Sequence, residues 1–416
     1  MSAPGQRTEV ITLGCRLNAL ESEIIQTRVD EAGLTDTVVV NTCAVTSEAE
    51  RQARQTIRKI RRMQPDARII VTGCAAQIAP QRFADMPEVD RVVGNDEKLA
   101  RETYDGTARV AVADIMASRV APDHTIGGFE TRTRAFVQIQ QGCDHRCTFC
   151  IIPFGRGNSR SVTPDAILRQ VERLTGAGYR EIVLTGVDIS SYGTDLSDAT
   201  TLGGLCSLLL ARTPRLARLR LSSLDPAVID ETLLALIARE PRLMPHLHLS
   251  VQAGSDMILK RMKRRHLRGD VIALAARLRD ARPDIILGAD LIAGFPTEDD
   301  AMFEDSLRIV EEADLTYLHV FPFSPRVGTP AARMPQLPGG LRRERAARLR
   351  ASGDARRALY MASLADSVAE ILAEKDNRGY TQHYAPARIA SDVRPGEIVR
   401  VRITGAEGGI LTAAAA

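Results

Sequence analysis

Three cysteines near the middle of the chain form the pattern best suited to chemistry. They have the spacing Cys143-x3-Cys147-x2-Cys150 and directly follow residues 135–141, which we expect to form a strand. Thiolates gathered in one tight loop bind zinc or iron–sulfur clusters. Structural zinc takes four protein ligands, whereas this loop offers three cysteines, and His145 is awkwardly placed between two of them. Three thiolates on a four-iron cluster would leave one iron open to bind a small molecule and pass it one electron. A zinc site or a purely structural cluster is the alternative.

Three other cysteines recur at one structural position in the first hundred residues. Cys15, Cys43 and Cys74 each follow a short run rich in β-branched residues, which predicts a buried parallel strand. Their separations of 28 and 31 residues each correspond to one strand–helix unit. In an open parallel sheet the loops after the strands share one edge, where ligands bind. We therefore expect these thiols to converge at that edge; the alternative is three unrelated buried thiols.

The remaining cysteine and the composition indicate an ordinary globular protein. Cys206 lies in an apolar helical pattern and is expected in the core. Hydrophobic residues make up 44% of the chain and charged residues 26%. The sequence shows neither an apolar stretch long enough for a membrane span nor the apolar core of a signal peptide. We therefore expect a cytoplasmic protein with reduced thiols and no membrane partner.

The basic residues are clustered although the net charge is only +3. A single basic run is usually a solvated helix face, whereas three runs in one chain favour a polyanionic partner. The runs contain Arg51, Arg54, Arg58, Lys59, Arg61 and Arg62; Lys260, Arg261, Lys263, Arg264, Arg265 and Arg268; and Arg342, Arg343, Arg345, Arg348, Arg350, Arg356 and Arg357.

The hydrophobic pattern predicts two α/β series and a β-rich end. Residues 8–100 alternate strands and helices as an open α/β domain, and residues 101–134 are expected to be a linker with a short strand near 109–112. Residues 135–340 hold six strand–helix steps, which predicts a partial barrel because a full eight-step barrel needs about 250 residues. Residues 341–372 are expected to be a helical, Arg-rich connection. The expected strands are 10–13, 38–40, 68–71 and 90–93, then 135–141, 181–187, 218–224, 246–251, 284–293 and 315–323. The expected helices are 18–32 and 47–63, then 164–177, 202–212, 226–239, 269–281 and 299–313.

The last segment, residues 373–416, is expected to form a small β-barrel. Residues 398–404 alternate apolar and basic side chains, which predicts a strand with Arg400 and Arg402 on its outer face. Because the chain ends in four alanines, we expect 413–416 to be a frayed tail and the barrel to lack its last strand.

The central cysteine spacing resembles the signature of the radical S-adenosylmethionine (SAM) superfamily, in which the open iron chelates the amino and carboxylate groups of SAM. Phe149 matches the aromatic residue that precedes the last cysteine of that signature. A glycine at a strand end is, taken alone, more often just a turn. The other matching positions, however, end successive barrel strands along the rim that carries barrel active sites, and this order supports the resemblance. It implies SAM contacts at Gly186, Asp188, Ser222, Ser223, Gln252 and at Ile292 within the stretch 288–298.

Three upstream cysteines on an α/β domain followed by such a barrel resemble the radical SAM methylthiotransferase family over about residues 8–412. The resemblance implies an α/β fold with a flavodoxin-like N-terminal domain, a central partial (β/α)6 radical SAM barrel and a small C-terminal RNA-binding β-barrel. The matching motifs are Thr12-Leu13-Gly14-Cys15-Arg16-Leu17-Asn18, Asn41-Thr42-Cys43-Ala44-Val45, Thr72-Gly73-Cys74, Val93-Gly94-Asn95, Ser250-Val251-Gln252-Ala253-Gly254-Ser255 and Phe323-Ser324-Pro325-Arg326.

The stretches 13–18, 185–188 and 191–193 resemble the branch of the family that modifies threonylcarbamoyladenosine in tRNA. The resemblance implies two [4Fe-4S] clusters. A cluster on Cys143, Cys147 and Cys150 would cleave one SAM to a 5′-deoxyadenosyl radical, and a cluster on Cys15, Cys43 and Cys74 would hold a sulfur that a second SAM methylates. The methylthio group would then join carbon 2 of the adenine beside the anticodon. The expected partners are the tRNA anticodon loop, SAM and an electron donor such as flavodoxin or ferredoxin, and the protein is expected to be a monomer.

Other functions stay open from the sequence. The related branches act on isopentenyladenosine in tRNA or on an aspartate of a ribosomal protein. A protein substrate would be indicated by weak salt dependence of substrate binding. The unrelated alternative is an iron–sulfur sensor that binds RNA without catalysis, in which the SAM motifs would be idle and the reduced protein would not cleave SAM.

Overall fold

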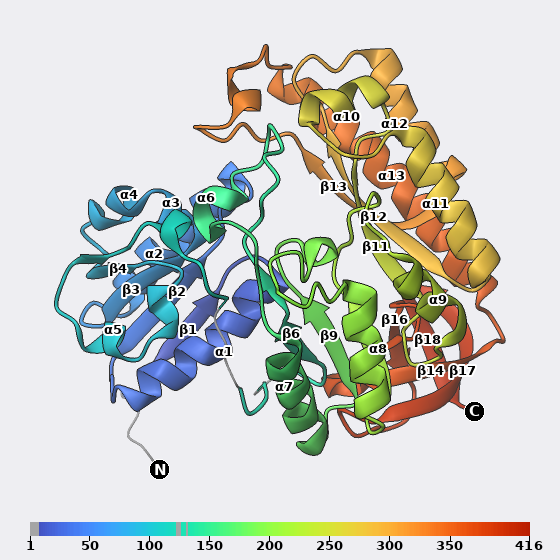
Figure 1. Ribbon diagram of the computed structural model, residues 1–416, viewed down its shortest axis with the longest axis horizontal. Helices are drawn as coiled ribbons and strands as arrows, with labels where there is room; N and C mark the ends of the chain where they lie inside the picture. Colours follow the sequence, from blue (N-terminus) through green and yellow to red (C-terminus); the bar gives the residue numbers. More distant parts are fainter. Residues whose placement is uncertain (1–7, 122–125, 130–131) are drawn as a thin grey trace.

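The computed structural model describes residues 8–121, 126–129 and 132–416. The first seven residues and parts of the expected linker lie outside these ranges. Figure 1 shows an N-terminal α/β unit in blue and cyan, a central α/β unit in green to orange and a C-terminal barrel in red. This arrangement confirms the predicted fold class. In the described part of the chain, no helix has the length and apolar character needed to cross a membrane.

The N-terminal unit is a five-stranded parallel sheet whose strands follow chain order, β1-β2-β3-β4-β5. Every residue of β2 is buried, as its β-branched composition predicts. A flavodoxin sheet has the strand order 2-1-3-4-5. This unit therefore resembles flavodoxin in having helices on both faces of a parallel sheet, but not in its strand order. The short strand predicted near 109–112 is β5, so the sheet extends into residues expected to be a linker. The strands are β1 Glu9–Thr12, β2 Thr37–Thr42, β3 Arg68–Gly73, β4 Arg91–Val93 and β5 Val110–Ala111.

Helices cover both faces of this sheet. Ile25 and Val29 of α1 pack with Val39 on one face, whereas Ile57 of α2 packs with Val38 on the other. The two faces follow from the alternation of side chains along β2. The predicted helices 18–32 and 47–63 are thus confirmed. The helices are α1 Arg16–Glu31, α2 Ser47–Met63, α3 Cys74–Ile78, α4 Pro80–Ala84 and α5 Glu102–Asp105, with 3-10 turns η1 Glu97–Leu99 and η2 Ile115–Ala117.

The central unit is the predicted partial barrel of six parallel strands. The sheets β10-β9-β6 and β11-β12-β13 are joined by parallel bridges from Leu219 to Leu243 and from Leu224 to Leu249. A short antiparallel pair, β7 with β8, flanks the first strand. The strands are β6 Ala135–Gln138, β7 Gln140–Gln141, β8 Arg160–Ser161, β9 Glu181–Thr185, β10 Arg218–Leu221, β11 His246–Gln252, β12 Ile286–Ala293 and β13 Leu315–Pro322.

Helices pack on the outer face of this barrel, and the hydrophobic core lies between these helices and the strands. Leu247 and Leu249 of β11 and Leu287 of β12 point outward into that core. The five helices predicted between the strands are present, but α9 begins five residues later than predicted, because Asp230 caps it by accepting from the Leu233 N–H. The short α6 and α10 were not predicted. The helices are α6 Ile152–Arg156, α7 Pro164–Gly176, α8 Leu202–Arg212, α9 Glu231–Arg239, α10 Asp256–Met262, α11 Arg268–Ala281 and α12 Asp300–Glu312, with 3-10 turns η3 Ile189–Ser191 and η4 Pro330–Arg333.

The C-terminal barrel corrects one prediction. It is a closed five-stranded barrel of order β14-β15-β16-β18-β17, and the alanine-rich end forms its last strand. Ala413 pairs with both Ile389 and Ile403 and is only 2% exposed, because its small side chain fits the narrow interior. The alanine-rich end is therefore an ordered strand as far as Ala415, and not the frayed tail that was expected. The connecting helix α13 Gly339–Ser363 also ends earlier than predicted. The strands are β14 Val368–Ala373, β15 Arg378–Thr381, β16 Pro386–Ile389, β17 Ile398–Glu407 and β18 Ile410–Ala415, with a 3-10 turn η5 Lys375–Asn377.

Buried arginines attach this barrel to the central unit. Arg218 donates to the carbonyl oxygen of Glu370 at 3.0 Å, and Arg220 donates to that of Thr381 at 2.9 Å. Both arginines also pair with the buried Glu181. Arg218 and Glu181 are the first residues of β10 and β9, so the C-terminal barrel is attached at the amino ends of these strands, opposite the cysteine loop.

Candidate active site

The Cys143–Cys150 loop begins directly after β7. Gly142 has φ +73°, and a Cβ there would lie 1.9 Å from the carbonyl oxygen of Asn158, so this entry point requires glycine. The Cys150 N–H donates to the Cys147 carbonyl oxygen at 3.0 Å, which forms a tight turn between the last two cysteines. The loop is therefore held in one compact conformation.

The loop is fastened to the far side of the barrel by its residues 148 and 149. Thr148 donates from its N–H to the Met262 carbonyl oxygen at 3.1 Å and from Oγ1 to that of Arg261 at 2.7 Å. Phe149 packs in an apolar cluster that also contacts Ile292. The cysteine loop is thus placed over the carboxyl ends of β11, β12 and β13.

The loop after β9 is positioned by Gln140, which sequence reasoning missed. Its Oε1 accepts hydrogen bonds from the N–H groups of Val187 at 3.0 Å and Asp188 at 2.8 Å. A Cβ at Gly186 would lie 2.7 Å from the Gln140 carbonyl oxygen, so the close approach requires glycine. Gln140 therefore ties the first two barrel strands together at the rim.

Asp188 lies beside the cysteine loop. Its Oδ2 accepts a hydrogen bond from Ser191 Oγ at 2.8 Å, lies 3.1 Å from His145 Nε2 and lies 3.9 Å from Cys143 Sγ. Burial alone would raise the pKa of Asp188, but the contacts with His145 and Ser191 lower it. The side chain is therefore an ionised carboxylate that suits a ligand ammonium group.

The other residues predicted to contact SAM occupy the same rim. Ser222 and Ser223 follow β10, Gln252 ends β11 with φ +72°, and Ile292 lies near the end of β12. Because β9 and β10, and likewise β11 and β12, pair in parallel, these positions and Asp188 are at the carboxyl ends of their strands. The structure brings the predicted residues to one edge and leaves Ser223 exposed.

The thiols of this loop fit a cluster better than a single zinc ion. Thiols that ligate one tetrahedral zinc ion lie about 3.8 Å apart, given a zinc–sulfur distance of about 2.3 Å. Within the described ranges, in neither cysteine triad do all three sulfur atoms lie within 4.8 Å of one another. Burial and Asp188 raise the pKa of Cys143 to about 12, and burial raises that of Cys150 to about 11. A metal charge would be needed to hold them as thiolates.

The N-terminal cysteines come together at the carboxyl edge of the N-terminal sheet. Cys15, Cys43 and Cys74 follow β1, β2 and β3. A Cβ at Gly14 would lie 2.7 Å from the Cys43 Cβ, so Cys43 packs directly against the residue before Cys15. Burial raises the pKa of Cys43 to about 11, and the neighbouring thiols of Cys74 and Cys15 add to the effect. Among the described residues, the donor set is again three sulfurs without a fourth cysteine.

A buried arginine contacts this second triad. Arg156, at the end of α6, donates from Nε to Cys74 Sγ at 3.0 Å. Its guanidinium also binds the Glu21 carboxylate and Asn18 Oδ1, and the residue is only 1% exposed. Asn18 in turn donates to the Leu13 carbonyl oxygen at 2.7 Å, which anchors the loop that carries Cys15.

A second buried cation completes this network. Lys98 Nζ contacts Glu21 Oε2 and Asn95 Oδ1, each at 2.7 Å, and both ends of the Lys98–Glu21 pair are fully buried. Burial would raise the pKa of Glu21, but Arg156 and Lys98 lower it, so it is ionised. Burial lowers the pKa of Lys98, so the guanidinium of Arg156, which contacts Cys74, is the positive charge that favours a bound thiolate.

One short segment connects the two cysteine triads. Cys150 ends the first triad, α6 follows at once, and Arg156 reaches the second. A Cβ at Gly155 would lie 3.3 Å from the Cys74 Cβ, so α6 packs closely on α3. The first triad is thereby coupled through the backbone to the second.

Comparisons with known proteins agree with this geometry. Residues 137–310 match the Radical SAM superfamily, and residues 7–94 match the family described as Uncharacterized protein family UPF0004. The threonylcarbamoyladenosine tRNA methylthiotransferase MtaB of Rickettsia prowazekii is 47% identical over 97% of this chain and 96% of its own. The enzyme of the same name from Bacillus subtilis is 36% identical over 94% of this chain and 92% of its own.

A solved structure shares the fold. The radical S-adenosylmethionine methyltransferase TsrM of Kitasatospora setae, solved with cobalamin and a [4Fe-4S] cluster, has a TM-score of 0.55 at 16% identity and covers 78% of this chain and 76% of its own. The fold and the three-cysteine loop define a radical SAM enzyme. The chain belongs to the radical SAM methylthiotransferase family, in the branch of the threonylcarbamoyladenosine tRNA methylthiotransferases, and its chemistry is that of SAM and [4Fe-4S] clusters.

Proposed function

We propose that this tRNA methylthiotransferase converts threonylcarbamoyladenosine beside the anticodon to its 2-methylthio derivative, using two SAM molecules and two [4Fe-4S] clusters. The observation that carries the proposal is the pair of three-cysteine sets, each at the carboxyl edge of a parallel sheet, joined by the segment from Cys150 to Arg156. The choice of substrate is supported by the likeness to the two relatives over nearly their whole length.

The first site would bind SAM and the radical-generating cluster. Cys143, Cys147 and Cys150 would hold the cluster, and the ionised Asp188 would accept the ammonium group of SAM. Phe149 packs in an apolar cluster with Ile292, another predicted SAM contact, and would line one side of the site. When bound, the cluster and SAM supply the radical chemistry that opens the carbon–hydrogen bond of the base.

The second site would hold the auxiliary cluster. Cys15, Cys43 and Cys74 supply three thiolates, which leaves one iron for an added sulfur. Arg156 would donate to a ligating sulfur and offset the negative charge of the thiolates. The protein thereby keeps the methylthio source next to the barrel rim.

The tRNA backbone would be held by basic side chains to which the described part of the chain offers no carboxylate partner. Arg400 on β17 and Lys59 and Arg62 on α2 are exposed and unpaired among the described residues. The third basic run, the arginines between 342 and 357, was expected to bind a polyanion but is largely paired within the protein. Arg345 is buried against Glu298, and other arginines of α13 also pair with acidic residues of the central unit. The phosphate-binding surface is therefore smaller than the sequence suggested.

The chemistry also needs an electron from outside. Cleaving SAM consumes one electron at the first site, so we propose a small electron-transfer protein such as flavodoxin or ferredoxin as the donor. It would approach the exposed side of the 143–150 loop.

The experiment is to digest tRNA from cells that lack the protein and from the same cells complemented with it. We expect the 2-methylthio derivative of threonylcarbamoyladenosine to be absent in the first and restored in the second, with the unmodified precursor accumulating. A Cys143→Ala gene should fail to restore it. If the derivative persists without the protein, the proposed substrate is wrong.

A further inference from the structure

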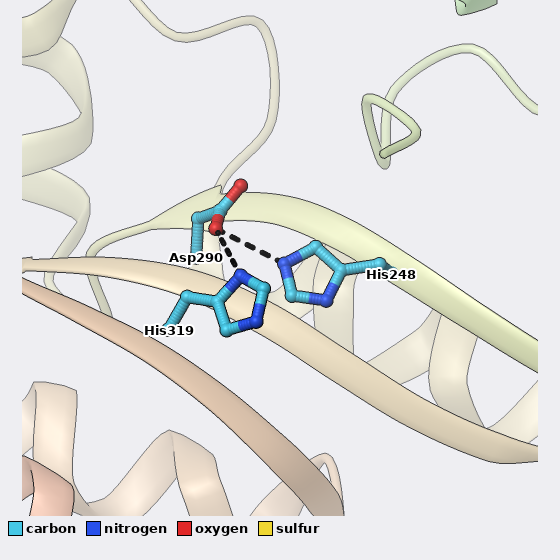
Figure 2. A group of neighbouring side chains, drawn as sticks. All are labelled: His248, Asp290 and His319. Atoms are coloured by element: carbon cyan, nitrogen blue, oxygen red, sulfur yellow. Dashed lines mark ion pairs between the residues drawn. The ribbon is translucent and has the colours of Figure 1, made fainter. Parts of the chain in front are cut away.

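Three polar side chains converge inside the partial barrel and have no role in the sites above. Figure 2 shows His248 of β11, Asp290 of β12 and His319 of β13, with both imidazoles directed at one oxygen of Asp290. His248 Nε2 lies 3.0 Å and His319 Nδ1 lies 3.4 Å from Asp290 Oδ1. In the described part of the chain, this is the one set of three His, Cys, Asp or Glu residues with ligand atoms all within 4.8 Å.

The strand register brings these residues together. Asp290 is directly opposite His319 on β13, and His248 is opposite Gly288 on β12. A Cβ at Gly288 would lie 2.7 Å from His248 Nδ1, so the missing side chain lets the imidazole lean toward Asp290. Their neighbours in sequence pack outward into the core, so the three side chains face the barrel interior.

The set lies just below the rim where SAM would bind. Ile292, a predicted SAM contact, is the next residue of β12 to face inward after Asp290. Two residues of strand advance the chain by about 7 Å. His319 is 62% exposed and His248 only 10%, so one side of the set is open to the interior space.

The geometry is that of a metal site. Ligands at about 2.0–2.2 Å from one cation lie about 3.0–3.5 Å apart, which matches the two measured separations. His248 Nε2 is buried and forms no hydrogen bond, although it lies near Asp290.

We propose that His248, Asp290 and His319 bind a divalent first-row transition metal. Two imidazoles and one carboxylate suit such a metal and leave further coordination positions open. Those positions face the interior and would take a substrate carrying carboxylate and hydroxyl oxygens. This last role rests on the proposed function, since the threonyl group of threonylcarbamoyladenosine supplies both oxygens and an isopentenyl group supplies neither.

The alternative is an ordinary histidine–aspartate ion pair, and the chain offers a matched control for it. His383 Nε2 lies 3.1 Å from Asp284 Oδ2, and the described residues place no third ligand beside them. His383→Ala therefore removes a similar pair without touching the proposed site.

The test is Mn(II) binding to the holoenzyme with both clusters in their EPR-silent oxidised state, measured by the EPR signal of free Mn(II). We expect about one Mn(II) per chain, with affinity reduced more than about tenfold in Asp290→Asn and in His319→Ala and unchanged in His383→Ala. Iron content and circular dichroism should equal those of the unsubstituted protein in every variant. Equal Mn(II) binding by all four proteins, or none by the unsubstituted protein, would overturn the proposal.

The role in substrate binding is tested separately. With a tRNA that carries threonylcarbamoyladenosine, Mn(II) should lower KM more than kcat changes, and Asp290→Asn should abolish that dependence. If turnover occurs at a KM independent of Mn(II), the substrate role is wrong while the metal site is judged by the EPR result alone. If no methylthio product forms under any condition, the proposed function fails instead.

Discussion

Arg156 Nε lies 3.0 Å from Cys74 Sγ, although the two residues are 82 positions apart in different units of the fold. The contact joins the end of α6 to the second cysteine triad. Hydrogen bonds to the sulfurs of an iron–sulfur cluster are one of the determinants of its reduction potential. With the proposed auxiliary cluster on Cys74, the pair would therefore link the radical SAM barrel to the electronic properties of that cluster.

Arg156→Gln should lower both the reduction potential of the auxiliary cluster and the stability of the protein. The substitution removes a hydrogen-bond donor to the Cys74 sulfur. It also leaves Lys98 as the only ion-pair partner of Glu21, and breaking a buried ion pair costs about 3–5 kcal/mol. An EPR-monitored redox titration and thermal unfolding measure the two effects. The exposed Arg173→Gln on α7 serves as the control. An unchanged potential in Arg156→Gln would show that the contact does not act on the cluster.

Cys43→Ala should remove one cluster and leave the other. We expect iron to fall from about eight to about four atoms per chain, while the reduced protein still cleaves SAM at the other triad. Iron and sulfide analysis with a SAM-cleavage assay measures this. Cys206→Ala, at a fully buried core cysteine, should keep its full iron content. Retention of about eight irons by Cys43→Ala would exclude Cys43 as a ligand.

Stability should fall as the pH drops below about 6.5, partly through His246. Burial first, and then Arg220 and His248, hold the pKa of His246 well below its ordinary value, so the folded protein keeps it neutral. Unfolded histidine takes up a proton near pH 6.5, so this stabilising contribution is complete above that pH and is lost as the pH falls, at up to about 1.4 kcal/mol per pH unit.

His246→Phe tests this contribution. The phenyl ring can keep the stacked contact with Tyr384, whose ring centroid is 5.3 Å away, but it cannot titrate. Thermal unfolding between about pH 7.5 and pH 5.5 should show a smaller loss of stability in the variant than in the unsubstituted protein. Identical pH dependence in the two proteins would contradict the assignment.

Arg400→Gln with Arg402→Gln should weaken tRNA binding uniformly and reduce its salt dependence. Each lost phosphate contact lowers the slope of log affinity against log salt by about 0.7–0.9. Filter binding at several salt concentrations measures the slope. The control pair, Arg212→Gln with Arg215→Gln, removes the same charge from an exposed stretch at the end of α8. Equal slopes in the two double variants would exclude the outer face of β17 as a phosphate contact.

Much of the fold was predictable because its signals are local. The predicted helix 47–63 is α2, since its apolar residues recur at helical spacing, and the barrel strands fall where β-branched runs end in glycine or polar residues. The alanine-rich tail was not predictable as a strand, because alanine has little β propensity and only pairing with β17 and β16 orders it.

The cysteines were predictable as sites from their spacing, but their supporting residues were not. Arg156 and Glu21 are 135 positions apart, and Lys98 and Glu21 are 77 apart, so no periodicity connects them. His248, Asp290 and His319 likewise meet only through the strand register. The one available signal was the presence of charged residues inside otherwise apolar, motif-bearing segments.

The most direct measurement incubates anaerobically reconstituted holoenzyme with SAM, a reductant and one of two tRNAs, carrying either threonylcarbamoyladenosine or isopentenyladenosine. The nucleosides are then separated, and their masses are determined by mass spectrometry. We expect a methylthio group in place of hydrogen on threonylcarbamoyladenosine alone, and none with Cys15→Ala or Cys143→Ala. Methylthiolation of isopentenyladenosine, or of neither tRNA by a protein that holds both clusters and cleaves SAM, would contradict the proposed function.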